Sequence, residues 1–210
     1  RFFGLGQDIF IRTALLVLCE AMVLNQAAKL GDLDLATCQL VLTLFGILAF
    51  ALDAFAYAAE ALVGEAIGKR NLPDLQIVIR RTNSLAAGMA LGIAAILWLG
   101  DTVIIRLFTK QAALIAHAQT HWVWACLLAP ASFMAFQLDG IFVGATRGQD
   151  MRNAMIFSAG GLGIALLLLA PWSLQGLLAA FVGYLGLRGA SLWWHIDRVY
   201  AQAGPSLKQH

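Results

Sequence analysis

The sequence predicts an all-α integral membrane protein built as a bundle of six transmembrane helices. Of its 210 residues, 60% are hydrophobic and 12% are charged, whereas soluble domains contain roughly 45 to 50% apolar and about 25% charged residues. The mean hydropathy is +0.78. Charges are so sparse that successive stretches reach the length of about 20 helical residues needed to cross a hydrocarbon core of about 30 Å.

Three spans are predicted in the first half of the chain, at residues 9–29, 35–68 and 75–99. The polar turn at residues 30–34 separates the first two, because Gly and Asp favour turns. The second segment is longer than a straight crossing requires, so we expect it to tilt or to project from the membrane. Pro73 and Asp74 form a helix-start signal for the third span.

Three further spans are predicted in the second half, at residues 112–145, 153–170 and 174–194. Before them, residues 101–109 place apolar side chains on one helical face, which is typical of a short helix lying at the membrane interface. Pro130 interrupts the fourth span, and we expect a kink there because proline removes a backbone donor. Residues 195–210 are predicted to form a cytoplasmic tail.

The distribution of basic residues predicts the orientation, because Lys and Arg accumulate on the cytoplasmic side of a membrane. One side of the six-span arrangement holds eleven of the fourteen, namely Arg1, Arg12, Lys69, Arg70, Arg80, Arg81, Arg147, Arg152, Arg188, Arg198 and Lys208. The other side holds Lys29, Arg106 and Lys110. Trp98 and Trp172 fall at predicted outer ends, and Trp193 and Trp194 at an inner end, as in an aromatic belt. We therefore expect both termini of this segment to be cytoplasmic, in a cell (inner) membrane.

Composition and motifs disfavour several classes of function. The net charge of +2 is small and its basic residues form no patch, so no nucleic-acid partner is expected. No hydrolase, metalloprotease or P-loop motif occurs, which argues against an enzyme and a cofactor. Cys19, Cys38 and Cys126 lack metal or disulfide spacing and are interpreted as packing residues. His117 and His121 share a helical face without a third ligand nearby, so no metal site is expected.

Four acids inside the predicted spans are the main candidates for function: Glu20, Asp53, Glu60 and Asp139. A carboxylate at mid-bilayer costs about 2.5 to 3.5 kcal/mol and must face protein or water. Asp53, Tyr57 and Glu60 follow at i, i+4 and i+7, so they form one stripe along a helix. This stripe is expected to line a cavity or to pack on a neighbour. A purely structural role, fixing helix packing through hydrogen bonds, is the alternative.

Asp139 lies beside Gln137 and ahead of Gly140 and Gly144, whose G-x-x-x-G spacing allows close helix contact. It is either a functional acid or a bridge between two closely packed helices. Glu20, central in the first span, has the same two interpretations. A desolvated carboxylate exchanges a proton readily near neutral pH, which suits proton or cation coupling.

Arg12 lies near the start of the first predicted span. Its side chain could pair with Asp8 on the same helix. Snorkelling to the inner headgroups is the favoured interpretation, because a long basic side chain near a span end reaches the interface.

Four sequence runs carry a resemblance to a known family. LDAFAYAAEALVGEAIGKRN (Leu52 to Asn71) resembles the second helix of the C-terminal half in the DinF-type branch of the multidrug and toxic compound extrusion (MATE) transporters. LDGIFVGATRGQDMRNAM (Leu138 to Met155) resembles its tenth helix and the following loop. QDIFIRT (Gln7 to Thr13) and IIRLFTKQAALIAHA (Ile104 to Ala118) resemble the start of helix seven and the approach to helix ten. Together they are similar to helices seven to twelve of a twelve-helix fold.

The resemblance implies one lobe of a cation-coupled antiporter that exports organic cations or drugs by alternating access, with a missing N-terminal six-helix lobe as its partner. It also implies that Asp139 is the coupling or substrate acid. Glu20 departs from the DinF-type pattern and resembles the sodium-coupled NorM-type branch, so the transported ion stays open between proton and sodium. The candidate site comprises Asp139, Asp53, Glu60, Glu20, Tyr57 and Gln137.

Two alternatives remain open. A lipid-linked oligosaccharide flippase of the same wider superfamily would need a basic cavity, and the inward-facing acids argue against it. A non-transporting membrane assembly module would use the acids only for packing.

Overall fold

The computed structural model describes residues 2–169 and 173–204, and all of its regular secondary structure is helical. The long helices are α1 (Phe2–Leu30), α2 (Asp32–Gly68), α3 (Leu72–Leu99), α6 (Trp122–Gly144), α7 (Gly148–Leu169) and α8 (Leu174–Trp193). The short helices are α4 (Asp101–Phe108), α5 (Ala112–Thr120) and α9 (Asp197–Ala203). Arg1, Ala170, Trp172 and Lys208, which entered the span and orientation predictions, lie outside the described residues. The all-α expectation is confirmed.

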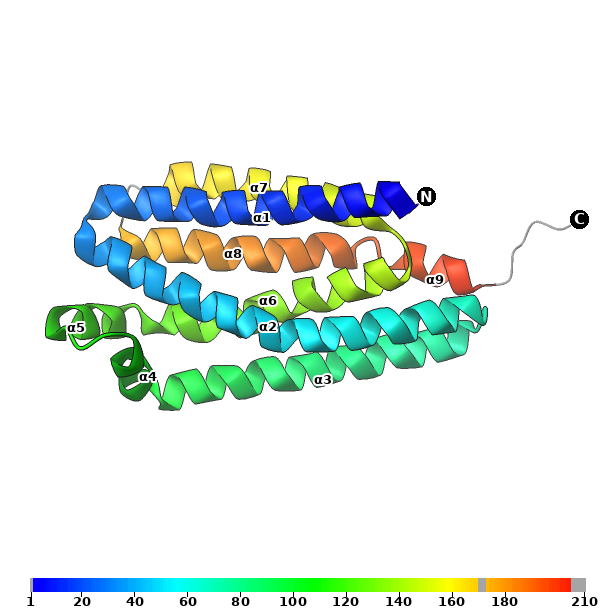
Figure 1. Cartoon of the computed structure of the whole chain (residues 1–210), viewed down its shortest axis with the longest axis horizontal. Coiled ribbons are helices and arrows are strands. Elements are labelled where there is room, and N and C mark those ends of the chain that lie inside the picture. The colour runs from blue at the N-terminus through cyan, green and yellow to red at the C-terminus, as the bar shows by residue number, and fades with distance from the viewer. Residues whose placement is uncertain (1, 170–172, 205–210) are drawn as a thin grey trace, which may run out of the picture.

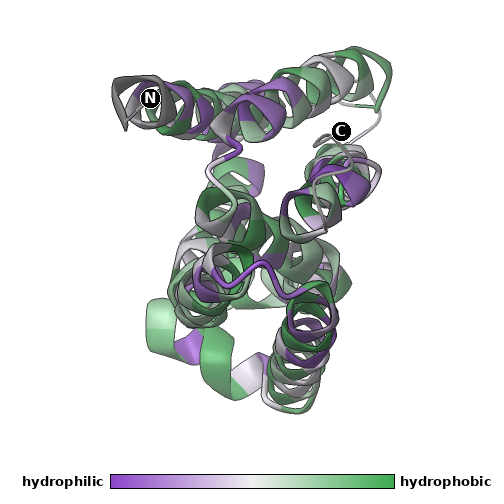
Figure 2. Cartoon of the chain, turned by 90° about the vertical axis from the view of Figure 1, so that its right-hand side faces the viewer, coloured by the Kyte–Doolittle hydropathy of each residue, from purple (hydrophilic) through white to green (hydrophobic). Residues whose placement is uncertain are grey.

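The long helices lie side by side, with α1 and α7 along one edge of the bundle and α3 along the opposite edge (Figure 1). Helices α2, α6 and α8 lie between them. Among the described residues, five segments are long and apolar enough to cross a membrane: α2, α3, α6, α7 and Leu174–Ala203. The first predicted span falls in α1, which is not one of these five, so the count of six crossings stays a prediction. Seen nearly end-on, most of the ribbon is hydrophobic (Figure 2).

The chain reverses between the first two long helices at one residue, Gly31, whose φ of +136° favours glycine. The predicted turn at residues 30–34 is therefore too long, because Asp32 and Asp34 already belong to the first turn of α2. Carboxylates are favourable there, since they face the positive end of the helix dipole. At the next reversal the Asn71 side chain accepts a hydrogen bond from the Asp74 backbone N–H, which confirms the predicted helix start.

The single fourth span predicted at residues 112–145 is wrong, because the helix breaks at His121 into α5 and α6. Tertiary contacts hold the break. The Trp122 indole N–H donates to the Leu97 carbonyl at the end of α3 (2.7 Å), and α5 packs against α2 and α4. Pro130, where a kink was expected, lies within the continuous helix α6.

The predicted interfacial segment and the predicted C-terminal tail both contain a short helix. Helix α4 buries Ile105 and exposes Val103 and Leu107, so the predicted short amphipathic helix is confirmed, while its place at a membrane interface stays a prediction. The predicted tail at residues 195–210 contains α9, which packs on α2 and α3 and buries Val199. This segment is therefore part of the bundle through Gly204, and residues 205–210 lie outside the described part.

Helices α2 and α6 touch through their backbones. A Cβ atom on Gly140 would lie 2.8 Å from the Ala56 Cα, and one on Gly144 would lie 3.1 Å from the Glu60 Cα. Both distances are far below ordinary van der Waals separation, so glycine is required for this approach. The close helix contact predicted from the G-x-x-x-G spacing is confirmed, and it fixes the register of the two helices.

Candidate functional site

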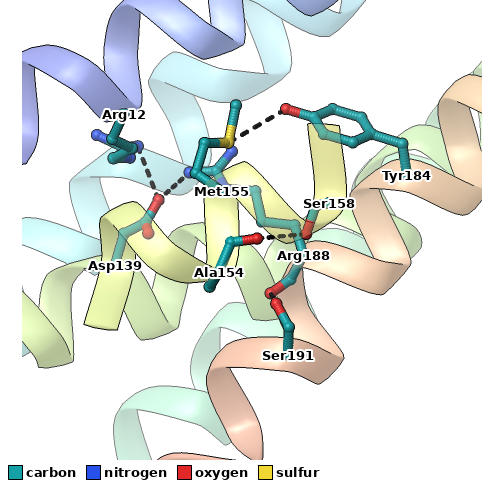
Figure 3. Close-up of polar contacts among 8 residues, drawn as sticks. All are labelled: Arg12, Asp139, Ala154, Met155, Ser158, Tyr184, Arg188 and Ser191. Carbon is teal, nitrogen blue, oxygen red and sulfur yellow. Dashed lines mark hydrogen bonds and ion pairs between the residues drawn. The ribbon is translucent and has the colours of Figure 1, made fainter. Parts of the chain in front are cut away.

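A buried ionic cluster joins three helices at Asp139 of α6. The Asp139 Oδ2 atom accepts a hydrogen bond from Arg12 Nη2 of α1 (2.7 Å) and another from Arg188 Nη2 of α8. Figure 3 shows both guanidinium groups directed at this carboxylate. The exposed fractions of the side chains are 8% for Asp139, 17% for Arg12 and 1% for Arg188. We call these three residues the Asp139 cluster.

The position of Arg188 is fixed by packing as well as by charge. Its guanidinium carbon lies 5.6 Å from the centre of the Phe136 ring on α6, within the range of a cation–π interaction. Asp139 and Phe136 thus hold it from two sides. Asp139 is the ion-pair partner of Arg188 in the described part of the chain, and removing the acid partner of such a buried cation is strongly destabilising.

Two sequence interpretations are corrected here. Arg12 neither snorkels nor pairs with Asp8, whose carboxylate instead accepts from Arg152 of α7 (2.7 Å). Arg188 was counted among the inner-side charges but lies inside the bundle. Helix packing explains the position of Arg12. Because α1 packs along α7 and contacts α8, Arg12 comes close to Asp139 of α6. The inward-facing ionisable groups therefore include two arginines as well as the predicted acids.

Part of the cluster's hydrogen-bonding capacity is unused. Arg12 Nε and Arg188 Nη1 are buried and have no hydrogen-bond partner among the described residues. Both arginines instead share one carboxylate oxygen. The cluster by itself has two positive charges and one negative charge.

A second polar group lies between α2 and α6, one turn from their closest contact. Ala56 faces Gly140 and Glu60 faces Gly144, so the two helices run in the same direction with a constant register. Extending that register by one turn places Asp53 level with Gln137. Gln137 is 1% exposed, and neither polar atom of its amide is hydrogen-bonded within the described part of the chain.

The α3 helix, which packs on both α2 and α6, contributes a further unsatisfied group. The Asn83 Oδ1 atom is buried and has no partner within residues 2–169 and 173–204. Buried amides are normally hydrogen-bonded. The unsatisfied amides of Gln137 and Asn83 are therefore each available to a polar ligand.

The predicted stripe on α2 is divided by the structure. Asp53 and Glu60 are half-buried, whereas Tyr57 is 68% exposed and projects from the bundle. Tyr57 does not pack on a neighbouring helix among the described residues, because α6 lies against the Ala56 side of α2, and the alternative that this stripe lines a cavity stays a prediction. Glu20 is half-buried on α1. Together with Asp53 and Glu60, it has no hydrogen bond or ion pair to another described residue.

At the opposite end of the bundle, His117 of α5 contacts two polar residues of α2. His117 Nε2 lies 3.2 Å from Asp34 Oδ1, and His117 Nδ1 lies 3.0 Å from Thr37 Oγ1. The His117 and His121 rings are 4.8 Å apart. These contacts tie α5 to the start of α2. Among the described residues, no group of three His, Cys, Asp or Glu side chains is arranged to hold a metal.

One further cluster escaped the sequence interpretation. Asp150 is buried at the start of α7 and accepts from Arg147 Nε (2.5 Å) and Arg198 Nη1 (2.6 Å). The i, i+3 spacing of Arg147 and Asp150 was a usable signal for the first pair. Arg198 lies 48 positions away, and only the docking of α9 brings it near.

Comparison with known proteins gives consistent matches. The family model described as MatE matches residues 9–169. The chain is 36% identical over 193 residues to the DNA damage-inducible protein F of Escherichia coli (strain K12), covering 91% of this chain and 42% of that protein. It is 23% identical over 200 residues to Protein DETOXIFICATION 45, chloroplastic, of Arabidopsis thaliana, covering 95% and 35%. Protein DETOXIFICATION 42 of the same plant is 24% identical over 199 residues, covering 93% and 38%. The chain spans about two fifths of the length of these relatives.

Proposed function

The chain belongs to the MatE family, and on this premise we propose that it is one lobe of a transporter that exports organic cations or drugs in exchange for protons or sodium. The names of its plant relatives, which refer to detoxification, support export of toxic solutes. A second six-helix lobe would complete the cavity, and the two lobes would alternate access between the membrane faces. We place the protein in the inner membrane with both ends of this segment cytoplasmic.

The proposal rests on the positions of Asp53 and Gln137, which lie at the same level of the packed helices α2 and α6. A half-buried carboxylate without an ion-pair partner in the described structure stands level with a buried amide that has no hydrogen bonds. Carboxylate and amide oxygens are ligands for hard cations such as Na⁺, and an intramembrane carboxylate also serves in proton relays. We assign binding of the coupling ion or of a cationic substrate to this region.

Asp139 receives a different part in this proposal. A cation that bound Asp139 directly would first have to displace Arg12 or Arg188 from the carboxylate. Direct ion binding is therefore assigned to Asp53, while Asp139 holds α1, α6 and α8 together around the cavity. Glu20 and Glu60, half-buried and without ion pairs in the described part of the chain, are further candidate acids.

Transport of ethidium, a small organic cation, tests the assignment. The intact protein is reconstituted in liposomes, and ethidium movement is measured under an imposed proton or sodium gradient. Asp53→Asn should lower the initial rate at least about tenfold, equivalent to a loss of about 1.4 kcal/mol. Glu65→Gln is the matched control, because Glu65 lies on the same helix in an exposed pair with Lys69, and should leave the rate unchanged. Full transport by Asp53→Asn would refute the assignment.

Thermal unfolding separates transport from an assembly role. If Asp53 binds the coupling ion as Na⁺, adding sodium in place of potassium should raise the Tm of the parent protein and not that of Asp53→Asn; for proton coupling, transport should follow the proton gradient alone. An assembly module would show neither response to ions, and Asp53→Asn would only lower its Tm. That pattern would favour the packing alternative.

A further inference from the structure

The Asp139 cluster has more cationic hydrogen-bond donors than its acid can satisfy. We propose that Arg12 and Arg188 form a binding site for the acidic group, carboxylate or phosphate, of an anionic amphiphile. The site lies between α1, α6 and α8 (Figure 3). It adjoins the Asp53–Gln137 region but uses different side chains, and it does not depend on the proposed cation export.

The donor geometry supports an acidic ligand. A guanidinium carries five N–H donors in a fork that matches carboxylate or phosphate oxygens two at a time. Each arginine uses Nη2 on the same Asp139 oxygen, and Arg12 Nε and Arg188 Nη1 have no partner in the described residues. Phe136 covers a side of the Arg188 guanidinium, which leaves the donors in its plane for a ligand. The two guanidinium groups therefore meet at one carboxylate oxygen, and each keeps a buried donor that Asp139 does not use.

The ion pairs within the cluster support the same conclusion. Two buried or nearly buried cations share direct contact with one acid, and a charge without a paired acid away from water is unfavourable. Asp53 lies within electrostatic range of Arg12, Arg188 and Asp139 but forms no ion pair with a described residue. Glu20 is the other acid nearby, next to Cys19, which is within range of Arg188. An entering anion would gain the arginines and be opposed by these two carboxylates.

Access to the site is through Arg12. Its side chain retains 17% exposure, whereas Arg188 retains 1%. Arginine has a flexible stem, so a shift of the Arg12 side chain can open Arg188 to a ligand without moving a helix. The apolar side chains of the membrane-spanning bundle suit the hydrophobic part of an amphiphile, which accounts for the ligand class.

Three probes with one ring system test the site: 2-naphthoate, 2-naphthamide and 2-naphthylmethylammonium. Binding to the intact protein is measured by fluorescence in nanodiscs of phosphatidylcholine. We expect 2-naphthoate to bind at least about tenfold more tightly than 2-naphthamide, because only the carboxylate uses the free donors. Equal binding of these two probes overturns the proposal.

The variant Arg12→Gln removes the excess charge while keeping the buried Asp139–Arg188 pair, so the fold should survive. It should reduce the preference for 2-naphthoate to less than about twofold. Arg152→Gln is the matched control, since Arg152 of α7 forms an ion pair with Asp8 of α1 outside the cluster, and should keep the full preference. Arg12→Lys retains the charge without the fork and should give an intermediate preference. An unchanged preference in both Arg12 variants overturns the proposal.

Two further arms identify the ligand source and separate this site from the proposed transport function. Adding phosphatidylglycerol to the nanodiscs should weaken 2-naphthoate binding if the natural ligand is a lipid headgroup and should leave it unchanged if it is a free solute; the Arg12→Gln result holds in either case. Asp53→Asn should strengthen 2-naphthoate binding by removing a repelling acid. Loss of ethidium transport together with stronger 2-naphthoate binding in Asp53→Asn would support the anion site and separate it from the proposed ion site, whereas unchanged or weaker 2-naphthoate binding in this variant contradicts the proposal.

Discussion

Asp139 links three helices through its side chain. Its carboxylate accepts from Arg12 of α1 and Arg188 of α8 through one oxygen atom. Because Arg188 is 1% exposed, water cannot replace this acid if it is lost. The network therefore makes the effect of a substitution depend strongly on which partner is removed.

Asp139→Asn should lower the stability by about 3 to 5 kcal/mol, because it leaves two cations without an acid. Arg12→Gln should cost no more than about 1 kcal/mol, since Arg12 keeps contact with solvent and a neutral ion pair remains. A thiol-reactive dye measures both effects on heating in detergent, because Cys19, Cys38 and Cys126 are free and buried in the folded protein. Equal melting temperatures for the two variants would contradict the role assigned to Asp139.

At the scale of secondary structure, the α2–α6 contact determines which polar side chains meet. Gly140 and Gly144 bring the two backbones together, and extending the resulting register by one turn puts Asp53 level with Gln137. A shift of either helix would separate these groups. The contact thus positions the candidate ion site as well as stabilising the bundle.

Gly144→Ala should destabilise the protein by about 1 to 3 kcal/mol, because the added methyl group overlaps the Glu60 backbone. Ethidium transport should fall with it, since α2 must move away from α6. Gly163→Ala is the matched control: a Cβ at Gly163 meets no atom within 4 Å, and alanine favours the helix. The comparison uses the same thermal and transport measurements. A Gly144→Ala protein with parental Tm and transport would show that the contact tolerates displacement.

At the scale of the whole molecule, ion pairs gather toward one end of the bundle. Asp8, Asp139 and Asp150 each bind one or two arginines, near the starts of α1 and α7 and the end of α6 (Figure 1). These contacts include α8 and α9. The end that the basic residues predict to be cytoplasmic is therefore cross-linked by charge between helices.

Cysteine labelling tests the predicted orientation. Lys69→Cys lies in the turn between α2 and α3, and Gln111→Cys lies between α4 and α5; both positions are exposed. The cells are first stripped of any outer membrane or wall that would keep the reagent from the protein. A membrane-impermeant maleimide should then label Gln111→Cys in intact cells, and should label Lys69→Cys only after the cell membrane is opened. The parent protein is the control, because its three cysteines are buried. The reverse pattern would invert the topology.

Much of the candidate site was visible in the sequence, but the relations within it were not. Asp53, Gln137 and Asp139 stood out because polar groups are costly in an apolar span. Arg12 was assigned to the headgroups and Arg188 to the inner side, since position along a helix does not tell which neighbouring helix a side chain meets. The break at His121 was missed for a related reason: the polar residues Gln119, Thr120 and His121 interrupt the apolar stretch only briefly, and Trp122, the first residue of α6, is held by a long-range hydrogen bond to Leu97.

The sequence by itself determined the all-helical membrane class, the approximate extent of most long helices and the close contact at Gly140 and Gly144. These properties depend on local composition, hydropathy and the absence of a side chain at set intervals. Only the tertiary structure decided that Asp139 is shared by two arginines, that Asp53 comes level with Gln137, and that α9 docks on the bundle. Those contacts join residues far apart in the chain, and they arise only when helix packing fixes rotation and register together.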